Sequence, residues 1–174
     1  MARRTSKNKK ISTARQESDI PKIISGVYND RTTGTPLCAV IDNADTHSAD
    51  YSALSKLARP GHADYTGAIR YRGFNDVRGG GHFSGRLTAP LVFAGAVCGQ
   101  ILERRGIYVG AHISSIKEIH DCRYNPIGIG REQLLSIREK KFPVINDEKG
   151  KEMIELINSA REAKDSVGGI IECI

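Results

Sequence analysis

The sequence contains no apolar run that approaches the ~20 residues needed to span a bilayer. Its basic start also lacks the apolar segment of a signal peptide. We therefore expect a soluble, cytoplasmic protein without a membrane partner. The four cysteines, at positions 38, 98, 122 and 173, are widely scattered, and three of the four lie in apolar segments. This spacing favours reduced thiols in the core over a disulfide framework or a zinc site.

Several catalytic motifs are missing as well. There is no HExxH, CxxC, P-loop, nucleophile elbow or Ser-His-Asp order, so hydrolases, metalloenzymes and nucleotide kinases are not indicated. The glycines at 79–81 do not complete GxGxxG, because Ser84 stands where the last glycine belongs. A metal site built from His112, His120 and Cys122 is conceivable, but their spacing is unusual and we expect no metal.

Positive charge is concentrated at the start of the chain. Of the net charge of +6, all is accounted for by six basic residues before position 16, where no acid occurs: Arg3, Arg4, Lys7, Lys9, Lys10 and Arg15. Such an arm on a neutral body suits nucleic acid, a solvated tail or an anionic metabolite. Composition alone leaves these three interpretations open.

The coarse pattern predicts strands and helices in mixed order. Apolar, β-branched runs at 20–28 and 36–43 flank a turn and predict an antiparallel hairpin. Residues 51–57 predict a short helix, and the glycine-rich stretch 59–85 predicts a long loop. Further on, the pattern predicts an amphipathic helix from about Thr88, a strand at 107–116, helices at 131–140 and 147–164, and a strand at 166–174.

Two polar blocks, RPGHADYT (59–66) and SGRLTA (84–89), carry the candidate chemistry. His62 has small neighbours, with Arg59 before it and Asp64 after it, so either proton transfer or a turn-stabilising role suits it. Ser84, Arg86 and Thr88 enter the predicted helix, whose free N–H groups favour anions. Helix capping is the competing role for the two hydroxyls. His82 is either a cofactor contact or a surface imidazole.

These blocks form part of a long, collinear resemblance to chorismate synthases over residues 3–174. The matching segments are RR (3–4), TARQESD (13–19), SGV (25–27), TTGTP (32–36), the polar stretch 43–51, RPGHADYT, RGGG (78–81), SGRLTA and DSVGG (165–169). The combination of RPGHADYT with RGGG and S-G-R-x-T is highly specific.

The resemblance implies a carbon–oxygen lyase of the shikimate pathway of aromatic amino acid biosynthesis. Such enzymes convert 5-enolpyruvylshikimate 3-phosphate to chorismate by 1,4-anti elimination of phosphate. They need reduced FMN, and whether NADP(H) supplies the electrons on the enzyme or a separate reductase does so stays open. By the same resemblance, His62 is the catalytic, flavin-side histidine. Ser84, Arg86 and Thr88 are flavin-binding, and the arginines at 3, 4, 15 and 59 bind the phosphorylated substrate.

Departures from the family pattern predict an internal fragment that is inactive alone. The usual GESHG block with a second histidine is missing before residue 1, and the usual C-terminal half is missing after DSVGG. His82 and Phe83 replace an arginine and a hydroxyl residue, so their roles stay open. The resemblance further implies an α+β sandwich of helices between antiparallel sheets, here truncated, and a homotetramer.

We expect residues 1–19 to form a basic, substrate-side arm and residues 20–174 to form a partial domain. The alternative from a different class is a non-catalytic module that uses this arm to bind anions or nucleic acid. The neutral body and the RPGHADYT block give that alternative no support, so nucleic acid is not the expected partner.

Overall fold

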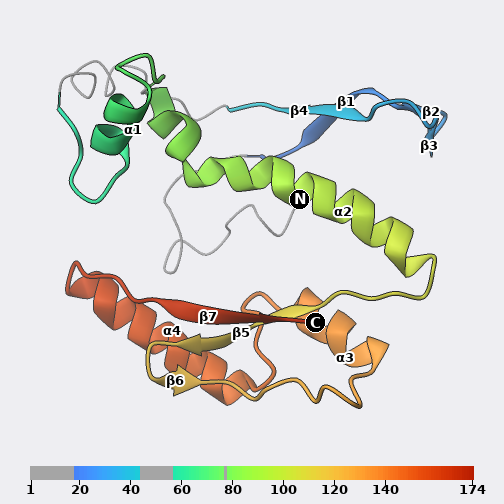
Figure 1. Ribbon diagram of the computed structural model, residues 1–174. Coiled ribbons are helices and arrows are strands. Elements are labelled where there is room, and N and C mark those ends of the chain that lie inside the picture. Colours follow the sequence, from blue (N-terminus) through green and yellow to red (C-terminus); the bar gives the residue numbers. More distant parts are fainter. Residues whose placement is uncertain (1–17, 44–56, 77) are drawn as a thin grey trace. The chain divides into compact units, whose positions relative to one another are not determined.

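The computed structural model describes residues 18–43, 57–76 and 78–174 (Figure 1). It divides into two compact units. Among the described residues, the first unit extends to Gly95 and the second begins at Ala96, inside one helix. Each unit combines helices with small antiparallel sheets, which confirms the mixed α+β class. The helix predicted at 51–57 falls almost entirely outside the described residues.

The first unit contains the predicted hairpin. Strand β1 (Pro21–Ser25) pairs antiparallel with β4 (Cys38–Ile41), and Pro21 lies opposite Ile41. A bulge between Ile23 and Ser25 interrupts the register. Two short strands, β2 (Val27–Tyr28) and β3 (Arg31–Thr32), continue the hairpin to its tip. The hairpin therefore consists of two successive strand pairs, and β3 lies within the segment that the sequence predicts as a turn.

The stretch 59–85 is not the continuous loop that the sequence predicts. Helix α1 (Asp64–Arg70) forms within it, and 3-10 turns follow at Arg78–Phe83 and Gly85–Leu87. One internal glycine costs a helix only about 1 kcal/mol. An acid in the first turn and Arg70 in the last turn both complement the helix dipole.

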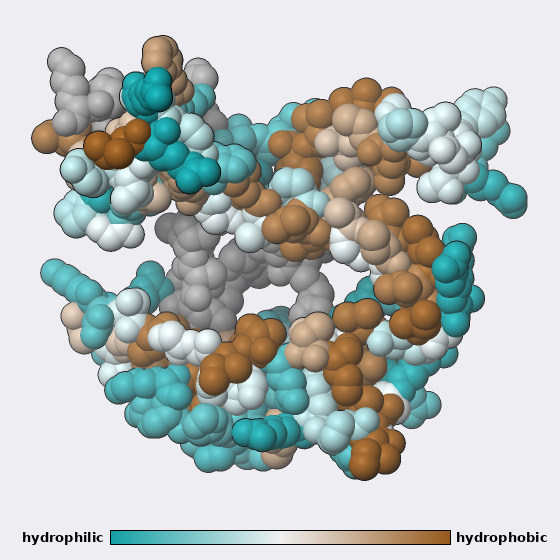
Figure 2. Space-filling model, viewed as in Figure 1, coloured by the Kyte–Doolittle hydropathy of each residue, from teal (hydrophilic) through white to brown (hydrophobic). Residues whose placement is uncertain are grey.

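Helix α2 (Thr88–Glu103) is confirmed, with the proline near its start and Gly106 at positive φ just beyond its end. It is not amphipathic as predicted, because exposed apolar residues project in several directions, among them Leu91, Val92 and Ile101. Figure 2 shows apolar surface along this helix. The expectation about apolar runs is also wrong. Gly85–Glu103 spans 19 residues of mean hydropathy 1.3, enough to cross a membrane by length and composition, although core helices of soluble proteins share that property.

The second unit is built on a three-stranded antiparallel sheet of order β6-β5-β7. The central strand β5 (Ala111–Ile116) pairs with β6 (Ile119–His120) and with β7 (Gly169–Cys173). Both long predicted helices are confirmed as α3 (Arg131–Glu139) and α4 (Asp147–Glu162), and they contact this sheet. The buried core consists mainly of Tyr124, Leu134, Ile137, Val144 and Met153.

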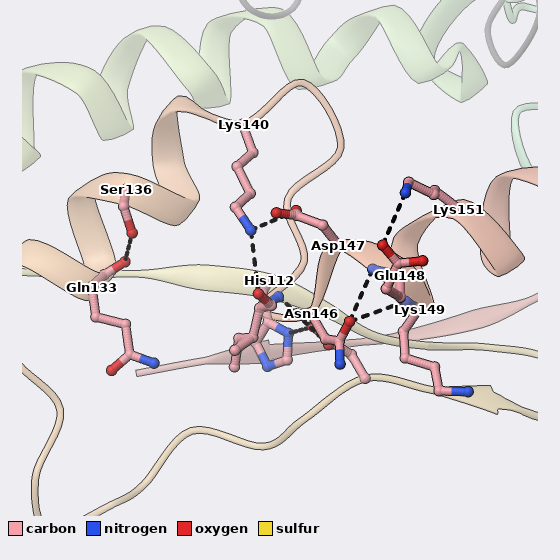
Figure 3. A network of polar contacts seen from close by, with 11 residues as sticks. His112, Gln133, Ser136, Lys140, Asn146, Asp147, Glu148, Lys149 and Lys151 are labelled. Atoms are coloured by element: carbon pink, nitrogen blue, oxygen red, sulfur yellow. Dashed lines mark hydrogen bonds and ion pairs between the residues drawn. The ribbon is translucent and has the colours of Figure 1, made fainter.

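A side-chain cap fixes the start of α4. The Asn146 side-chain oxygen accepts hydrogen bonds from the backbone N–H groups of Glu148 (2.9 Å) and Lys149 (3.3 Å). Figure 3 shows this cap beside the ion pair of Lys140 with Asp147. Such caps typically contribute about 1 kcal/mol. The helix therefore begins where its first free N–H groups find an acceptor.

The cysteine prediction is half right. All four cysteines are free, but all four are exposed, so the expected core positions are wrong. Cys122 lies between a buried Asp121 and an exposed Arg123, and Cys173 lies on the edge strand β7. Apolar sequence neighbours indicated burial for these thiols, but they do not specify which side of a strand or helix is covered.

A fully buried histidine connects three segments of the second unit. The His112 side chain on β5 is entirely excluded from solvent. Its Nδ1 lies 3.0 Å from Asp121 Oδ2, and its Nε2 lies 2.7 Å from Glu172 Oε2 on β7. Asp121 also accepts the backbone N–H groups of Ile145 and Asn146, which precede α4. The His112 imidazole thus connects the sheet, through Asp121, to the segment that precedes α4.

Acid is expected to weaken this unit through Glu172. The hydrogen bond from His112, followed by the backbone N–H of Tyr124, holds the pKa of Glu172 below its ordinary 4.5, and the charge of Arg123 acts in the same direction. A carboxyl whose pKa is lower in the folded state stabilises fully above its unfolded pKa. That stabilisation is lost as pH falls through the folded value. Hydrogen exchange of β5 and β7 amides should therefore show the free energy of opening decreasing as pH falls below 4.5.

The matched variants are Glu172→Gln and Glu118→Gln. The first removes the titrating group and should flatten this pH dependence. The second changes an exposed carboxylate on the β5–β6 turn and should leave it unchanged. An unaltered acid slope in Glu172→Gln would show that the carboxylate is not its source.

Candidate functional site

A tight turn places the two candidate side chains of the RPGHADYT block together. The backbone N–H of His62 donates to the carbonyl of Arg59 at 3.3 Å, across Pro60 and Gly61. Proline at the second position and a glycine at φ +72° at the third are typical of a type II turn, which requires positive φ there. Arg59 and His62 therefore stand at the two ends of one four-residue turn, directly before α1.

Asp64, the first residue of α1, closes this turn with its carboxylate. One oxygen, Oδ2, accepts from the Arg59 backbone N–H at 3.0 Å and from Arg59 Nε at 2.7 Å. The other, Oδ1, accepts from Arg59 Nη2 at 2.9 Å and lies 2.7 Å from His62 Nδ1. The side chain is only 8% exposed. Both oxygens are therefore used within the turn.

The same contacts keep Asp64 ionised. The side-chain hydrogen bonds from Arg59 hold the pKa of Asp64 far below its usual range, against the opposing effect of burial. The Arg59 backbone N–H and the charges of Arg59 and His62 act in the same direction as the side-chain bonds. A carboxylate is thus fixed beside an imidazole that is itself only partly exposed, at 26% of its side chain.

The SGRLTA block forms a capped turn into α2. Ser84 Oγ accepts from the backbone N–H of Arg86 at 3.2 Å, and Thr88 Oγ1 donates to the Gly85 carbonyl at 2.7 Å. Arg86 reaches back to the hairpin, where Nη1 pairs with the buried Asp19 at 2.6 Å and Nη2 donates to the Asp42 carbonyl. Ser84 therefore has the capping role considered for it, whereas the bond from the Thr88 hydroxyl to a carbonyl does not cap a free N–H group. The flavin contacts of both residues stay predictions.

Phe83, which directly precedes the SGRLTA block, packs against the helix that the RPGHADYT block begins. Its ring lies 6.3 Å from that of Tyr71, measured between centroids, and it covers Gly67 on α1 so closely that a Cβ there would approach it to 2.4 Å. A cavity of about 350 Å³ opens beside this contact. The residues lining it are Tyr71, Phe74, Asn75, Asp76, His82 and Phe83.

The two residues that depart from the family pattern lie at this cavity. His82 and Phe83, whose roles the sequence leaves open, both line it. Phe74, another lining residue, is 92% exposed and thus accessible from solvent. Volumes of about 300–1,000 Å³ with apolar walls and few polar groups are usual for small-molecule sites.

Other predicted positions cannot be placed in the same way. Arg3, Arg4 and Arg15, with most of the expected arm at 1–19, lie outside the described residues. Within the part of the chain that is described, no three His, Cys, Asp or Glu side chains are grouped to hold a metal. In particular, His112 of the conceivable metal trio is buried between two carboxylates.

Sequence reasoning placed the carboxylate of Asp64 near His62, but it missed the bonds of Asp64 to Arg59 and the partners of Arg86. Asp19 and Asp42 lie 67 and 44 residues before Arg86, so no local pattern connects them. The contacts of Asp64 could have been predicted from the sequence. Asp64 follows His62 by two residues and Arg59 by five, and a turn and the start of a helix bring residues at these spacings together.

A carboxylate that contacts both an arginine and a partly exposed histidine can orient the imidazole for proton transfer. Comparison with known proteins identifies the family. The family model described as chorismate synthase matches residues 1–174. This chain therefore belongs to the chorismate synthase family.

Individual relatives agree. The chain is 45% identical over 166 residues to the chorismate synthase of Thermococcus kodakarensis, and 43% identical over 164 residues to that of Pyrococcus abyssi. These matches cover 95% and 94% of this chain but 44% of each relative. A solved structure described as a crystal structure of chorismate synthase superposes with a TM-score of 0.64 at 28% identity, covering 88% of this chain and 43% of that one. The chain thus spans less than half the length of the relatives it matches.

Proposed function

We propose that this chain supplies the proton-handling part of a chorismate synthase site. The reaction is the 1,4-anti elimination of phosphate from 5-enolpyruvylshikimate 3-phosphate. A C–H bond and the C–O bond to phosphate break, the ring double bond shifts and a second double bond forms. Phosphate leaves with the electron pair of the C–O bond and a base takes up the proton, without net redox change. The observation that carries the proposal is His62 held in the RPGHADYT turn by Asp64 and Arg59.

Each residue of the turn has a proposed role. His62 is partly exposed at the turn and exchanges a proton at the flavin side of the substrate. Arg59 offers a guanidinium for the anionic groups of the substrate, although Asp64 partly neutralises it. The arginines at 3, 4 and 15 complete the anion site in this proposal. Asp64 keeps a negative charge beside both groups.

The residues present also fit reduced FMN. The aromatic wall of Tyr71, Phe74 and Phe83 suits a planar ring system, and His82 adds a polar edge to the same cavity. In the proposal, His62, Ser84, Arg86 and Thr88 hold the flavin. When bound, the reduced flavin supplies electron density transiently to the substrate. The chain's own part is to orient the substrate and to hold or move the proton at His62.

The finer features of the family belong to the same proposal. We infer that the whole enzyme is a cytoplasmic homotetramer in which helices lie between antiparallel sheets, and that NADP(H) is a source of electrons for the flavin. The apolar surface along α2 supports a buried position for that helix in such an assembly. Nothing in the comparisons favours the nucleic-acid-binding alternative.

A graft tests the proposal. The matched 166-residue segment of the Thermococcus kodakarensis enzyme is replaced by the corresponding residues of this chain, and chorismate formation is followed with and without reduced FMN. We expect turnover that requires reduced flavin, because the graft restores the other half of the site. The isolated chain, given flavin, reductant and substrate, is expected to form no chorismate.

Two results would contradict the proposal. One is a folded, flavin-binding graft without turnover, which would show that this chain cannot supply its part of the site. The other is rapid turnover by the isolated chain, which would refute the claim that the remaining half is needed.

A further inference from the structure

From the contacts around the RPGHADYT turn we infer that Asp64 is the positioning residue for His62. It holds the proton on Nδ1 and leaves Nε2 as the proton-accepting atom. The inference deepens the proposed function and rests on it for its catalytic meaning. The protonation of the two ring nitrogens, however, is a property of the turn itself and can be measured separately.

The argument begins with the acceptor. Asp64 Oδ1 lies 2.7 Å from His62 Nδ1, well within hydrogen-bonding distance. An ionised carboxylate has no proton to donate, so a ring nitrogen this close to it is stabilised when that nitrogen carries the proton. Asp64 stays ionised because Arg59 donates to it from Nε, Nη2 and the backbone. The Nδ1–H form of His62 therefore follows from chemistry that involves no ligand.

The guanidinium competes for the same nitrogen. Arg59 Nη2 lies 3.2 Å from His62 Nδ1 and 3.4 Å from Nε2, so it faces the ring as well as the carboxylate. A guanidinium has donors only, so its closer approach to Nδ1 favours a lone pair there. The Asp64 oxygen lies closer still, at 2.7 Å, and its negative charge favours a proton on Nδ1. Arg59 Nη2 makes its own shorter contact with Asp64, at 2.9 Å, so the carboxylate decides the assignment.

The side chains of Asp64 and His62 have little freedom to move relative to one another. Asp64 is 8% exposed, and its own backbone is fixed as the first residue of α1. His62 is connected to Asp64 by one residue, Ala63, and to Arg59 by the turn hydrogen bond. Because the carboxylate is already bonded to Arg59 on both oxygens, it has little freedom to turn away. The imidazole ring is accordingly presented by its Nε2 edge.

Nitrogen-15 NMR of the isolated chain tests the assignment directly. At a pH where His62 is neutral, we expect its Nδ1 to show the shift of a protonated nitrogen and its Nε2 that of an unprotonated one. In Asp64→Ala the Nε2–H form should become dominant. In Asp42→Asn, whose side chain pairs with exposed Lys22, the His62 signals should not change. A wild-type His62 that is protonated on Nε2 would overturn the inference.

Folding is checked by the backbone signals of α1 and of strands β5 and β7. If Asp64→Ala loses the α1 signals, Asp64→Glu provides the second variant. It keeps a carboxylate and should retain Nδ1–H. The inference fails if Asp64→Glu retains α1 but favours Nε2–H.

The grafted enzyme tests whether the positioning matters for turnover. Losing a residue that orients a functional histidine typically costs about 10–100-fold. We expect Asp64→Ala to lower kcat by that factor, but to cost little more when His62→Ala is already present, because Asp64 acts through His62. Full additivity would contradict the positioning role. If both single variants kept full activity while the Nδ1–H form persisted, the proposed function would fail and the assignment of the proton would stand.

Discussion

Replacing His62 with alanine in the grafted enzyme is expected to lower kcat by about 10²–10⁴-fold, the usual contribution of a positioned acid–base group. The side chain is partly exposed at the end of the Arg59–His62 turn, so its loss removes a reactive nitrogen without opening the core. Steady-state chorismate formation at saturating reduced flavin measures the effect. Flavin binding, followed by fluorescence, separates loss of cofactor from loss of proton transfer.

His120→Ala is the matched control, because His120 is an exposed histidine in the second unit. It should leave kcat within a factor of about two, since exposed substitutions away from special features change stability by about 0.5 kcal/mol or less. A His62→Ala graft with more than half of the parental activity would remove His62 from the mechanism.

His112→Ala is expected to destabilise the second unit by about 3–5 kcal/mol, the usual cost of removing one partner from a buried charged network. The variant leaves Asp121 and Glu172 facing a void that the imidazole filled, and it removes the edge contact of that ring with Tyr124 at 4.5 Å. Figure 3 shows His112 among the polar contacts near the start of α4. Native-state hydrogen exchange of β5 and β7 amides reports the loss for this unit alone.

The control again is His120→Ala, on β6 beside the same strand β5, where a change within about 0.5 kcal/mol is expected. If His112→Ala left the exchange of β5 and β7 amides within 1 kcal/mol of the parent, roughly the contribution of one ordinary hydrogen bond, the network would be structurally dispensable.

Helices and strands with long apolar patterns could be predicted from the sequence, whereas short elements and contacts between distant residues could not. The hairpin of β1 with β4, and helices α2, α3 and α4, follow from apolar patterns that continue over many residues. Helix α1 has only seven residues and includes a glycine, so its pattern is too short to distinguish it from a loop. The buried role of His112 depends on residues 9 and 60 positions away, which no local pattern shows.

For the candidate site, the sequence supplied the residues and the structure supplied their partners. His62, Arg59 and the SGRLTA positions lie at turns, as the sequence predicts, and Asp64 lies beside His62. The pairing of Asp64 with Arg59 and the acceptors Asp19 and Asp42 came from the fold. Exposure was predicted least well. Four thiols and much of α2 are exposed where apolar neighbours indicated burial, because neighbouring sequence does not specify which face of an element is covered.

The contact between Phe83 and Gly67 couples two positions that lie 16 residues apart in the sequence. A Cβ at position 67 would approach the Phe83 ring at 2.4 Å, so any larger residue there requires the ring to move. Because that ring also lines the cavity beside His82, a substitution at position 67 on α1 would change the shape of the cavity without touching it.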